Sequence, residues 1–280
     1  MKLNIVPART GIAWVKGGIR VFWRQPMALS ALFFLTMAAM SIATLLPFIG
    51  PALALAMLPS ATLAMMVASA ETMQDRAPVP HVMLAAFRTM RQRLPEMAVL
   101  GALYAAGFLL IMAISALFDG GQFAEVYLGG APLTQEVAEN GDFQLAMWVS
   151  MLLYLPLSLL FWHAPGLVHW HNVPPVKSLF FSLVASVRNL GAFTVYGLGW
   201  LFVFAMGGIA MSLISGLLAA MGLVSAPAVL GGTMVGLAMM LAAMCFSSIV
   251  FTFRDCFEPP EKEAPALDGA APSAPELDQP

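Results

Sequence analysis

Residues 27–70 read MALSALFFLTMAAMSIATLLPFIGPALALAMLPSATLAMMVASA and contain no Asp, Glu, Lys or Arg. In the middle of this stretch, residues 47–51 place two prolines and a glycine within five positions, a composition typical of a tight turn. A helix needs about 20 apolar residues to cross the hydrocarbon core of a bilayer. The stretch therefore predicts two membrane-spanning helices, 27–46 and 51–70, that form a hairpin.

Four more apolar stretches of spanning length follow along the chain, at residues 97–118, 143–168, 192–222 and 228–253. The chain is 60% hydrophobic and 10% charged, whereas a soluble domain has roughly 25% charged residues. We therefore predict an all-α polytopic membrane protein with six transmembrane helices. The fifth stretch is long, so we expect it to tilt or to break near Gly207-Gly208. The predicted parts of the chain are an N-terminal cytoplasmic segment at 1–26, a membrane domain at 27–256 and a disordered acidic cytoplasmic tail at 257–280.

All 13 Lys and Arg residues fall in alternate segments between the apolar stretches. These residues are Lys2, Arg9, Lys16, Arg20, Arg24, Arg76, Arg88, Arg91, Arg93, Lys177, Arg188, Arg254 and Lys262. The loop at 119–142, by contrast, carries five carboxylates and no base. Because cytoplasmic loops retain Lys and Arg, both termini are predicted to be cytoplasmic. We infer a multi-pass protein of the bacterial inner membrane, with the acidic loop on the periplasmic side.

A short basic segment that opens with a proline precedes each odd-numbered span. Counting 13 residues from Pro7, Pro80 and Pro175 leads to an arginine each time. The first segment places Ile12, Val15, Ile19 and Phe22 on one helical face, the second Val82, Leu84, Ala85 and Phe87, and the third Leu179, Phe180, Leu183 and Val187. The pattern favours three parallel repeats of an interfacial amphipathic helix plus a two-helix hairpin. The alternative is three ordinary loops that retain arginine.

Basic amphipathic helices of this kind lie at the membrane surface and attract anionic lipid. The predicted anionic-lipid contacts are Arg20, Arg24, Arg88, Arg91, Arg93, Lys177 and Arg188. The expected partners are therefore the lipid bilayer and its anionic headgroups at the cytoplasmic leaflet, with no nucleic acid. Stripes of small residues, such as Ala52, Ala56, Ser60, Ala64 and Ala68, allow helices to approach closely. They favour packing within the chain, and they leave open a homo-oligomer or a membrane-protein partner.

The predicted spans contain no charged residue, although proton-coupled transporters usually need such groups. His163, His169 and His171 lie with two tryptophans at the end of the fourth span. Such a cluster is typical of an aromatic belt with histidines at the membrane interface. The alternative is a metal or proton site. The sequence contains no Walker loop, G-x-S-x-G or H-E-x-x-H motif. We therefore expect no enzyme activity, no metal and no cofactor.

Three segments carry a resemblance to other proteins: Val6-Pro7-Ala8-Arg9 with Trp14, then Phe22-Trp23-Arg24-Gln25-Pro26, and the turn at 47–51. With the six-span layout, they resemble an uncharacterised family of inner-membrane proteins of beta-proteobacteria, over about residues 1–255. The resemblance implies the topology and the compartment. It implies no activity and no site residue.

The function expected from these features is that of a non-enzymatic protein that organises lipid or acts as a scaffold or accessory protein. The alternative is a transporter or channel for a neutral or apolar solute. Its pathway would be lined by hydroxyl side chains: Ser41, Thr44, Ser60, Thr62, Ser115, Ser150, Ser158, Thr194, Ser212 and Ser215. A third possibility is an enzyme that acts on lipid with His163 or His169.

Overall fold

The computed structural model describes residues 2–74, 79–222 and 227–257. Within these ranges the chain forms helices and one isolated β-bridge, between Leu3 and Phe257. The helices are α1 (Thr10–Arg24), α2 (Pro26–Thr44), α3 (Gly50–Ala56), α4 (Leu58–Met73), α5 (Val79–Gln92), α6 (Leu94–Asp119), α7 (Gln122–Leu128), α8 (Gln135–Glu139), α9 (Gly141–Trp162), α10 (Ala164–His171), α11 (Pro175–Arg188), α12 (Leu190–Ala220) and α13 (Pro227–Cys256). The predicted all-α class is confirmed. The tail at 258–280, Arg76 and Lys262 lie outside the described residues.

Six helical segments are long and apolar enough to cross a membrane. They are Pro26–Thr44, Gly50–Met73, Leu94–Asp119, Gly141–His171, Leu190–Ala220 and Gly231–Cys256. Each overlaps one of the six predicted spans. The second and the fourth segments each join two helices: α3 with α4, and α9 with α10. Six membrane-spanning helices are therefore confirmed.

Local sequence explains where these helices end or bend. The turn between α2 and α3 contains Phe48 with φ of 65°, a left-handed conformation that is uncommon outside glycine. The breaks within the second and fourth spans fall next to Pro59 and Pro165, which occupy the first turn of α4 and of α10. By contrast, α12 runs unbroken through Gly207-Gly208. The glycine pair is therefore not a break.

The order of elements along the chain is a short helix followed by two spans, three times. The short helices are α1, α5 and α11, and each comes directly before an odd-numbered span, as the sequence indicates. This order agrees with the predicted repeat, while equivalence of the three units in space stays a prediction.

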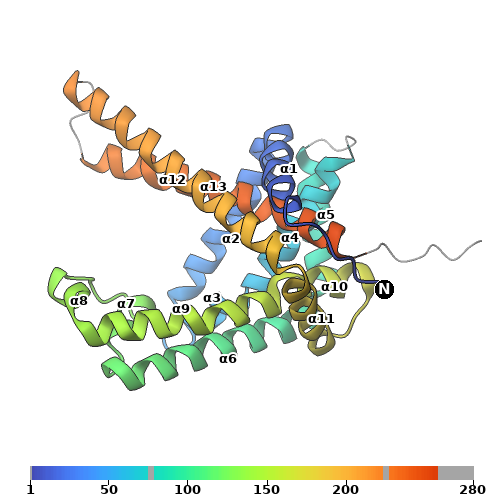
Figure 1. Ribbon diagram of the computed structural model, residues 1–280, viewed down its shortest axis with the longest axis horizontal. Helices are drawn as coiled ribbons and strands as arrows, with labels where there is room; N and C mark the ends of the chain where they lie inside the picture. Colours follow the sequence, from blue (N-terminus) through green and yellow to red (C-terminus); the bar gives the residue numbers. More distant parts are fainter. Residues whose placement is uncertain (1, 75–78, 223–226, 258–280) are drawn as a thin grey trace, which may run out of the picture.

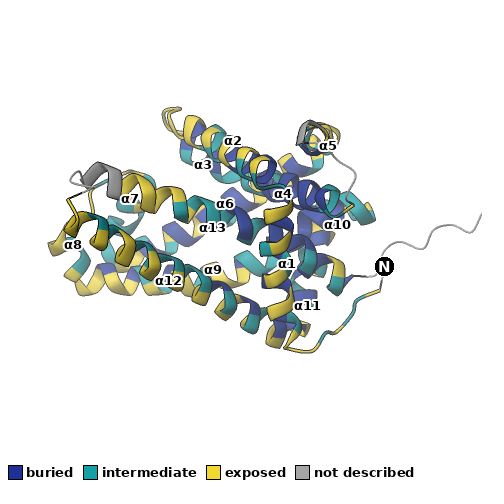
Figure 2. Cartoon of the chain, turned by 90° about the horizontal axis from the view of Figure 1, so that it is seen from above, coloured by how far each residue is buried: buried dark blue, intermediate teal, exposed yellow. Residues whose placement is uncertain are grey.

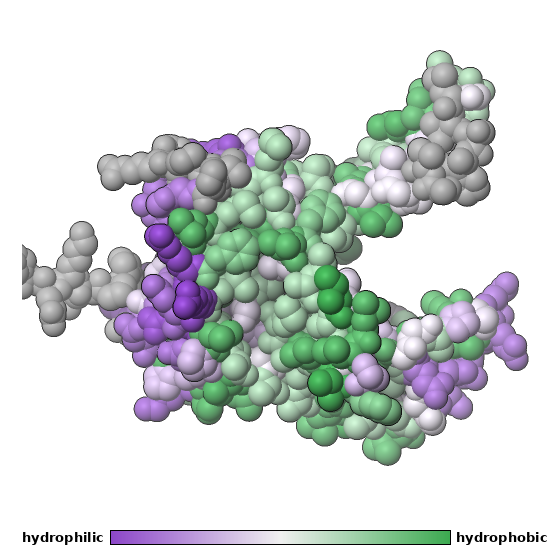
Figure 3. Space-filling model, turned by 180° about the vertical axis from the view of Figure 1, so that it is seen from behind, coloured by the Kyte–Doolittle hydropathy of each residue, from purple (hydrophilic) through white to green (hydrophobic). Residues whose placement is uncertain are grey.

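The spans leave a common base and diverge. Figure 1 shows α1, α5, α10 and α11 gathered at one end, with the α6–α9 pair and the α12–α13 pair pointing apart from it. We call the end that carries α1, α5 and α11 the basic end. The space-filling view in Figure 3 shows hydrophilic surface at this end and at the tip of the α6–α9 pair, with hydrophobic surface between them. An apolar band between two polar rims is the surface that a bilayer requires.

The core lies around α4, which is part of the most buried of the six spans, Gly50–Met73, whereas α12 is exposed along most of its length (Figure 2). The buried residues of α12 are Ala192, Tyr196 and Trp200, all in its first part. The small-residue stripe of the second span packs within the chain. A Cβ added at Gly101 of α6 would overlap the backbone of Ala56. This contact agrees with close helix packing at Ala56, while the same role for the rest of the stripe stays a prediction.

Candidate functional site

Helix α1 is packed into the helix bundle and does not only rest on its surface. Its buried residues include Gly11, Trp14 and Gly18, and it contacts α12 and α13. Cβ atoms added at the two glycines would overlap the backbone of Ala192 and the side chain of Ser248, respectively. The indole Nε1 of Trp14 donates a hydrogen bond to Asp255 Oδ2 at 2.9 Å. Close approach and this hydrogen bond fix α1 against the two last spans.

The predicted apolar face of α1 is therefore only partly right. Val15 and Phe22 are buried as expected, but Ile12 is 41% exposed. The face that packs is turned toward Trp14 and the glycines. A hydrophobic pattern does not count glycine as a packing residue, although its missing side chain is what lets two backbones approach.

A buried asparagine joins the N-terminal segment to the bundle. Asn189 Oδ1 accepts a hydrogen bond from the backbone N–H of Val6 at 2.8 Å, and its Nδ2 donates to the carbonyl of Asn4 at 3.0 Å. The backbone N–H of Asn4 donates to the carbonyl of Cys256 at 2.9 Å. Residues from both ends of the described chain thus meet at the junction of α11 and α12. The sequence analysis missed Asn189, because a polar residue at a helix junction has no local pattern.

Helix α11 turns small polar residues to the protein and apolar residues outward. Its buried residues are Ser178, Ser182, Ala185 and Ser186. Ser182 Oγ accepts from the backbone N–H of His163 at 2.9 Å and donates to the carbonyl of Leu159 at 2.8 Å. Phe180 and Val187 are exposed, beside the exposed Lys177 and Arg188. The outward face of α11 therefore combines apolar and basic side chains.

Helix α5 has the same character. Val82, Ala86 and Thr89 are buried, while Leu84 and Phe87 are exposed next to Arg88 and Arg91. The predicted apolar faces of α5 and α11 are thus only partly directed away from the protein: Leu84, Phe87, Phe180 and Val187 are exposed, whereas Val82 is buried and Ala85 and Leu179 pack against the core. The exposed apolar side chains are in the position expected of helices that lie on lipid. Lipid contact itself stays a prediction.

Six of the seven predicted lipid contacts are exposed: Arg20, Arg24, Arg88, Arg91, Lys177 and Arg188. The seventh, Arg93, is half-buried and is held by protein groups. Its guanidinium donates to Asn172 Oδ1 at 2.5 Å and to the carbonyl of His169 at 3.3 Å, and it lies 3.6 Å from a carboxylate oxygen of Glu96. Arg93 therefore joins the start of the third span to the end of the fourth.

Two clefts at the basic end contain predicted site residues. A groove of about 230 Å³ between α1, α4 and α13 is lined by Arg20 and Arg24. We call it the arginine groove, and its other lining residues are Gly17, Val21, Met73 and Phe251. A second cleft, of about 310 Å³ between α4, α5 and α10, contains Arg88 together with Glu71, His81 and His169. Arg91, Lys177 and Arg188 line neither cleft.

The three clustered histidines do not meet. His163 is completely buried, and its Nε2 lies 3.2 Å from Thr252 Oγ1, which also accepts from the indole of Trp162 at 3.1 Å. Since the Thr252 hydroxyl donates to the carbonyl of Ile249, His163 must donate through Nε2. His169 and His171 line two different clefts. The prediction of a histidine belt at the interface is therefore wrong for His163, which is a core residue.

Among the described residues, no group of three or more His, Cys, Asp or Glu side chains has the geometry to hold a metal ion. The hydroxyls named for a solute pathway are also dispersed. Two of these ten side chains, Thr62 and Ser158, line a common cavity. Several donate to a carbonyl of their own helix, as Ser115 does to Met112 and Thr194 to Leu190. Such bonds satisfy the hydroxyl locally and do not mark a path.

One curated relative covers almost the whole chain. It is described as a probable inner membrane protein of Burkholderia thailandensis, and it is 38% identical over 273 residues, which are 95% of this chain and 98% of the relative. No protein-family model matches the sequence. No solved structure matches it either.

Proposed function

The chain belongs to the same family as the probable inner membrane protein of Burkholderia thailandensis, and on that premise we propose that it is a non-enzymatic protein that organises lipid or a membrane-protein partner. It is an integral, multi-pass inner-membrane protein. The proposal is that its basic end binds anionic headgroups of the cytoplasmic leaflet. Both termini then lie in the cytoplasm.

The observation that carries the proposal is the composition of the outward faces of α1, α5 and α11. Trp23, Phe87 and Phe180 are exposed, and each is followed or preceded within three residues by an exposed Lys or Arg. An apolar side chain at the headgroup level and a basic side chain facing a phosphate are the two contributions that hold a helix on an anionic surface. Each Lys or Arg near such a surface contributes about 1 kcal/mol.

The arginine groove gives this attraction a defined place. Arg20 and Arg24 are one helical turn apart on α1, and α1 is fixed to α13 by Trp14 and Gly18. Two guanidinium groups on a fixed helix lose less conformational freedom on binding a phosphate than two groups on a mobile loop. We therefore assign the strongest anionic contact to this groove.

A scaffold role also needs a protein-facing surface. The exposed length of α12 offers apolar side chains such as Leu201, Phe202 and Leu213 to lipid or to a partner. The absence of enzyme activity is supported by the sequence, which lacks hydrolase, kinase and metalloprotease motifs, and by the core position of His163.

The alternative, a transporter or channel for a neutral solute, is supported by one observation: Thr62 and Ser158 share a cavity of about 110 Å³. Uptake of uncharged solutes by liposomes that contain the protein would test it. Replacement of Ser158 by Leu should abolish any such uptake if this route carries solute.

Lipid retention by the full-length protein tests the main proposal. The protein is purified in mild detergent from native membranes, and bound phosphatidylglycerol and phosphatidylethanolamine are counted by native mass spectrometry. The R20Q/R24Q variant should retain less phosphatidylglycerol, by about fivefold for each arginine removed. The matched control is Lys16→Gln. Lys16 is an exposed basic residue of the same helix, and its side chain does not line the groove. Equal phosphatidylglycerol retention by wild type and R20Q/R24Q would contradict the proposal.

A further inference from the structure

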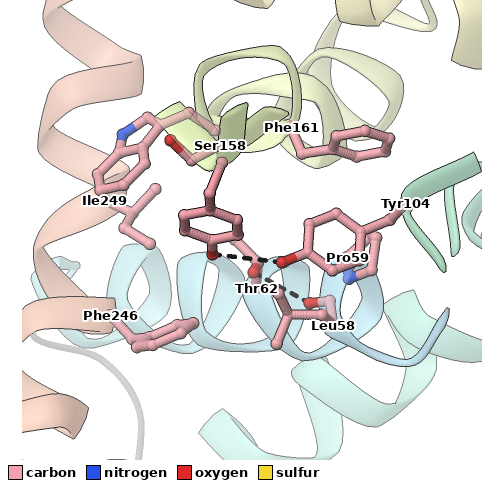
Figure 4. Close-up of a pocket in the computed structure, with 10 residues that line it drawn as sticks. Leu58, Pro59, Thr62, Tyr104, Ser158, Phe161, Phe246 and Ile249 are labelled. Carbon is pink, nitrogen blue, oxygen red and sulfur yellow. Dashed lines mark hydrogen bonds between the residues drawn. The ribbon is translucent and has the colours of Figure 1, made fainter. Parts of the chain in front are cut away.

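A cavity of about 110 Å³ lies between four of the spans, and Figure 4 shows the residues that line it. Its walls come from α4, α6, α9 and α13, and its lining residues are Leu58, Pro59, Thr62, Tyr104, Tyr154, Ser158, Phe161, Trp162, Phe246 and Ile249. We call it the tyrosine cavity. It lies between the α6–α9 pair on one side and α4 and α13 on the other.

The tyrosine cavity lies within the apolar part of the spans. Tyr104 is seven residues from the start of the apolar stretch 97–118, and Phe246 is seven residues from the end of the apolar stretch 228–253. At 1.5 Å per residue each lies about 10 Å inside a hydrocarbon core of roughly 30 Å. Tyr154 is 38% exposed on the protein surface, so the cavity opens toward lipid.

The chemistry of the walls selects an uncharged occupant. None of the ten lining residues is charged, and a charged ligand at this depth would have no counter-ion among them. Five of the ten are aromatic, and the Tyr104 ring packs edge to face on the Phe161 ring at a centroid distance of 5.1 Å. Such walls accept a flat ring. The cavity volume of about 110 Å³ is smaller than the roughly 150 Å³ of an engineered apolar cavity that binds benzene, so this cavity can enclose one edge of a substituted ring while the rest lies in the opening beside Tyr154.

Hydrogen-bond accounting shows what the ring must carry. The hydroxyls of Tyr104 and Tyr154 lie 3.3 Å apart, and in the described part of the chain this is the only hydrogen bond of either. One of the two therefore donates to the other, and one O–H remains without an acceptor. The hydroxyls of Thr62 and Ser158 are committed to the carbonyls of Leu58 and Leu155. The cavity thus offers one uncommitted donor in an apolar site.

We propose that the tyrosine cavity binds a neutral, membrane-dissolved molecule with a ring and a carbonyl oxygen, the chemistry of a quinone headgroup. The ring packs against Phe161 and Phe246, and the carbonyl oxygen accepts the hydrogen bond of the uncommitted tyrosine hydroxyl. Any longer substituent leaves through the opening beside Tyr154 into lipid. This binding site goes beyond the lipid-organising role and does not depend on it.

The two tyrosines give the proposal an unusual signature. With Tyr104→Phe or Tyr154→Phe alone, the remaining tyrosine loses its partner and still has one O–H to donate. Only the double variant has no donor. Each single variant should therefore bind within about threefold of wild type, whereas the double variant should bind about tenfold more weakly. Phenylalanine keeps the rings that pack the cavity, so the fold is retained.

The test uses the full-length protein in lipid nanodiscs, with duroquinone as the probe and quenching of tryptophan fluorescence as the readout, since Trp162 lines the cavity. Durene has the same tetramethyl ring without the oxygens and controls for partition into lipid. Tyr127→Phe is the matched control, because Tyr127 lies outside the cavity. Ser158→Leu fills the cavity, and its thermal midpoint reports whether the protein is folded.

We expect saturable quenching by duroquinone in wild type, in both single variants and in Tyr127→Phe. The double variant should bind duroquinone about tenfold more weakly. Folded Ser158→Leu should show no saturable quenching. Three results would overturn the proposal: equal binding by wild type and the double variant, equal saturable binding of durene, or no saturable binding of duroquinone by wild type. The last would indicate a cavity that holds only water or acyl chain.

Discussion

Replacement of Gly18 by Leu should separate α1 from the last span. A Cβ at this position would overlap the Ser248 side chain and would lie 3.0 Å from the carbonyl oxygen of Met244 and from the Ser248 Cα. Ordinary carbon contacts are about 3.5–4.0 Å, so even the first atom of the new side chain requires a shift of at least about 0.5–1.0 Å. Ser248 cannot move aside easily, because its hydroxyl is bonded to Tyr196 at 2.6 Å and to Trp200 at 3.2 Å.

The cost can be bounded from the structure. Overpacking of a close contact costs typically 1–3 kcal/mol, and leucine has a helix propensity about 0.8 kcal/mol better than glycine. If α1 leaves its seat, the buried Trp14 and Phe22 also become exposed, at about 1.5–3 kcal/mol for each large side chain. We therefore expect a destabilisation of about 2 kcal/mol or more. For a chain of this size that lowers the thermal midpoint by at least about 4–8 °C.

The assay is thermal unfolding in nanodiscs, followed by tryptophan fluorescence. The matched control is Gly197→Leu on α12, where an added Cβ meets nothing within 4 Å. That variant should unfold at or slightly above the wild-type temperature. If Gly18→Leu proved as stable as Gly197→Leu, α1 would not be seated against α13, and the reasoning would be refuted.

Two further substitutions test other contacts of the basic end. Thr252→Val removes the oxygen that accepts from the half-buried indole of Trp162 and the buried imidazole of His163. We expect a loss of about 2–4 kcal/mol in thermal or denaturant unfolding, whereas Thr194→Val, whose hydroxyl bonds only its own helix, should be close to neutral. A small effect of Thr252→Val would argue against the N–H donors assigned to it. Arg93→Gln loses the charged hydrogen bond to Asn172, so the free energy of unfolding should fall by about 1.5–3 kcal/mol. Its control is Arg91→Gln at an exposed position, whose free energy of unfolding should stay within about 0.5 kcal/mol of wild type in the same measurement. Equal stability of these two variants would remove the structural role of Arg93.

The sequence predicts the six spans well because each depends on a local property. An apolar run of spanning length and the proline-glycine turn at 47–51 are sufficient to place the first hairpin. The same applies to α1, α5 and α11, which begin close to the prolines that open the basic segments. The fifth span differs, because Gly207-Gly208 lowers helix propensity and yet stays helical. A Cβ at Gly207 would lie 2.9 Å from Leu241, which indicates that this glycine serves close packing.

The site was less accessible to sequence reasoning, because it depends on contacts between distant residues. Asn189 bonds residues more than 180 positions away, and nothing in its neighbourhood indicates this. His163 was grouped with His169 by spacing, but the chain breaks between α9 and α10 and turns His163 into the core. Arg93 fits the arginine repeat by position and differs in role, since its guanidinium is held by Asn172.

The central claim is that the basic end contacts anionic lipid, and Trp23 offers the most direct report of it. This side chain is 60% exposed and lies between Arg20 and Arg24 on α1. The fluorescence of Trp23 is obtained as the difference between wild type and Trp23→Phe. The measurement is how strongly brominated phosphatidylglycerol and brominated phosphatidylcholine each quench this fluorescence. The account predicts several-fold stronger quenching by phosphatidylglycerol, with the difference lost at about 1 M salt, where the Debye length is about 3 Å. Equal quenching by the two lipids at low salt would contradict it.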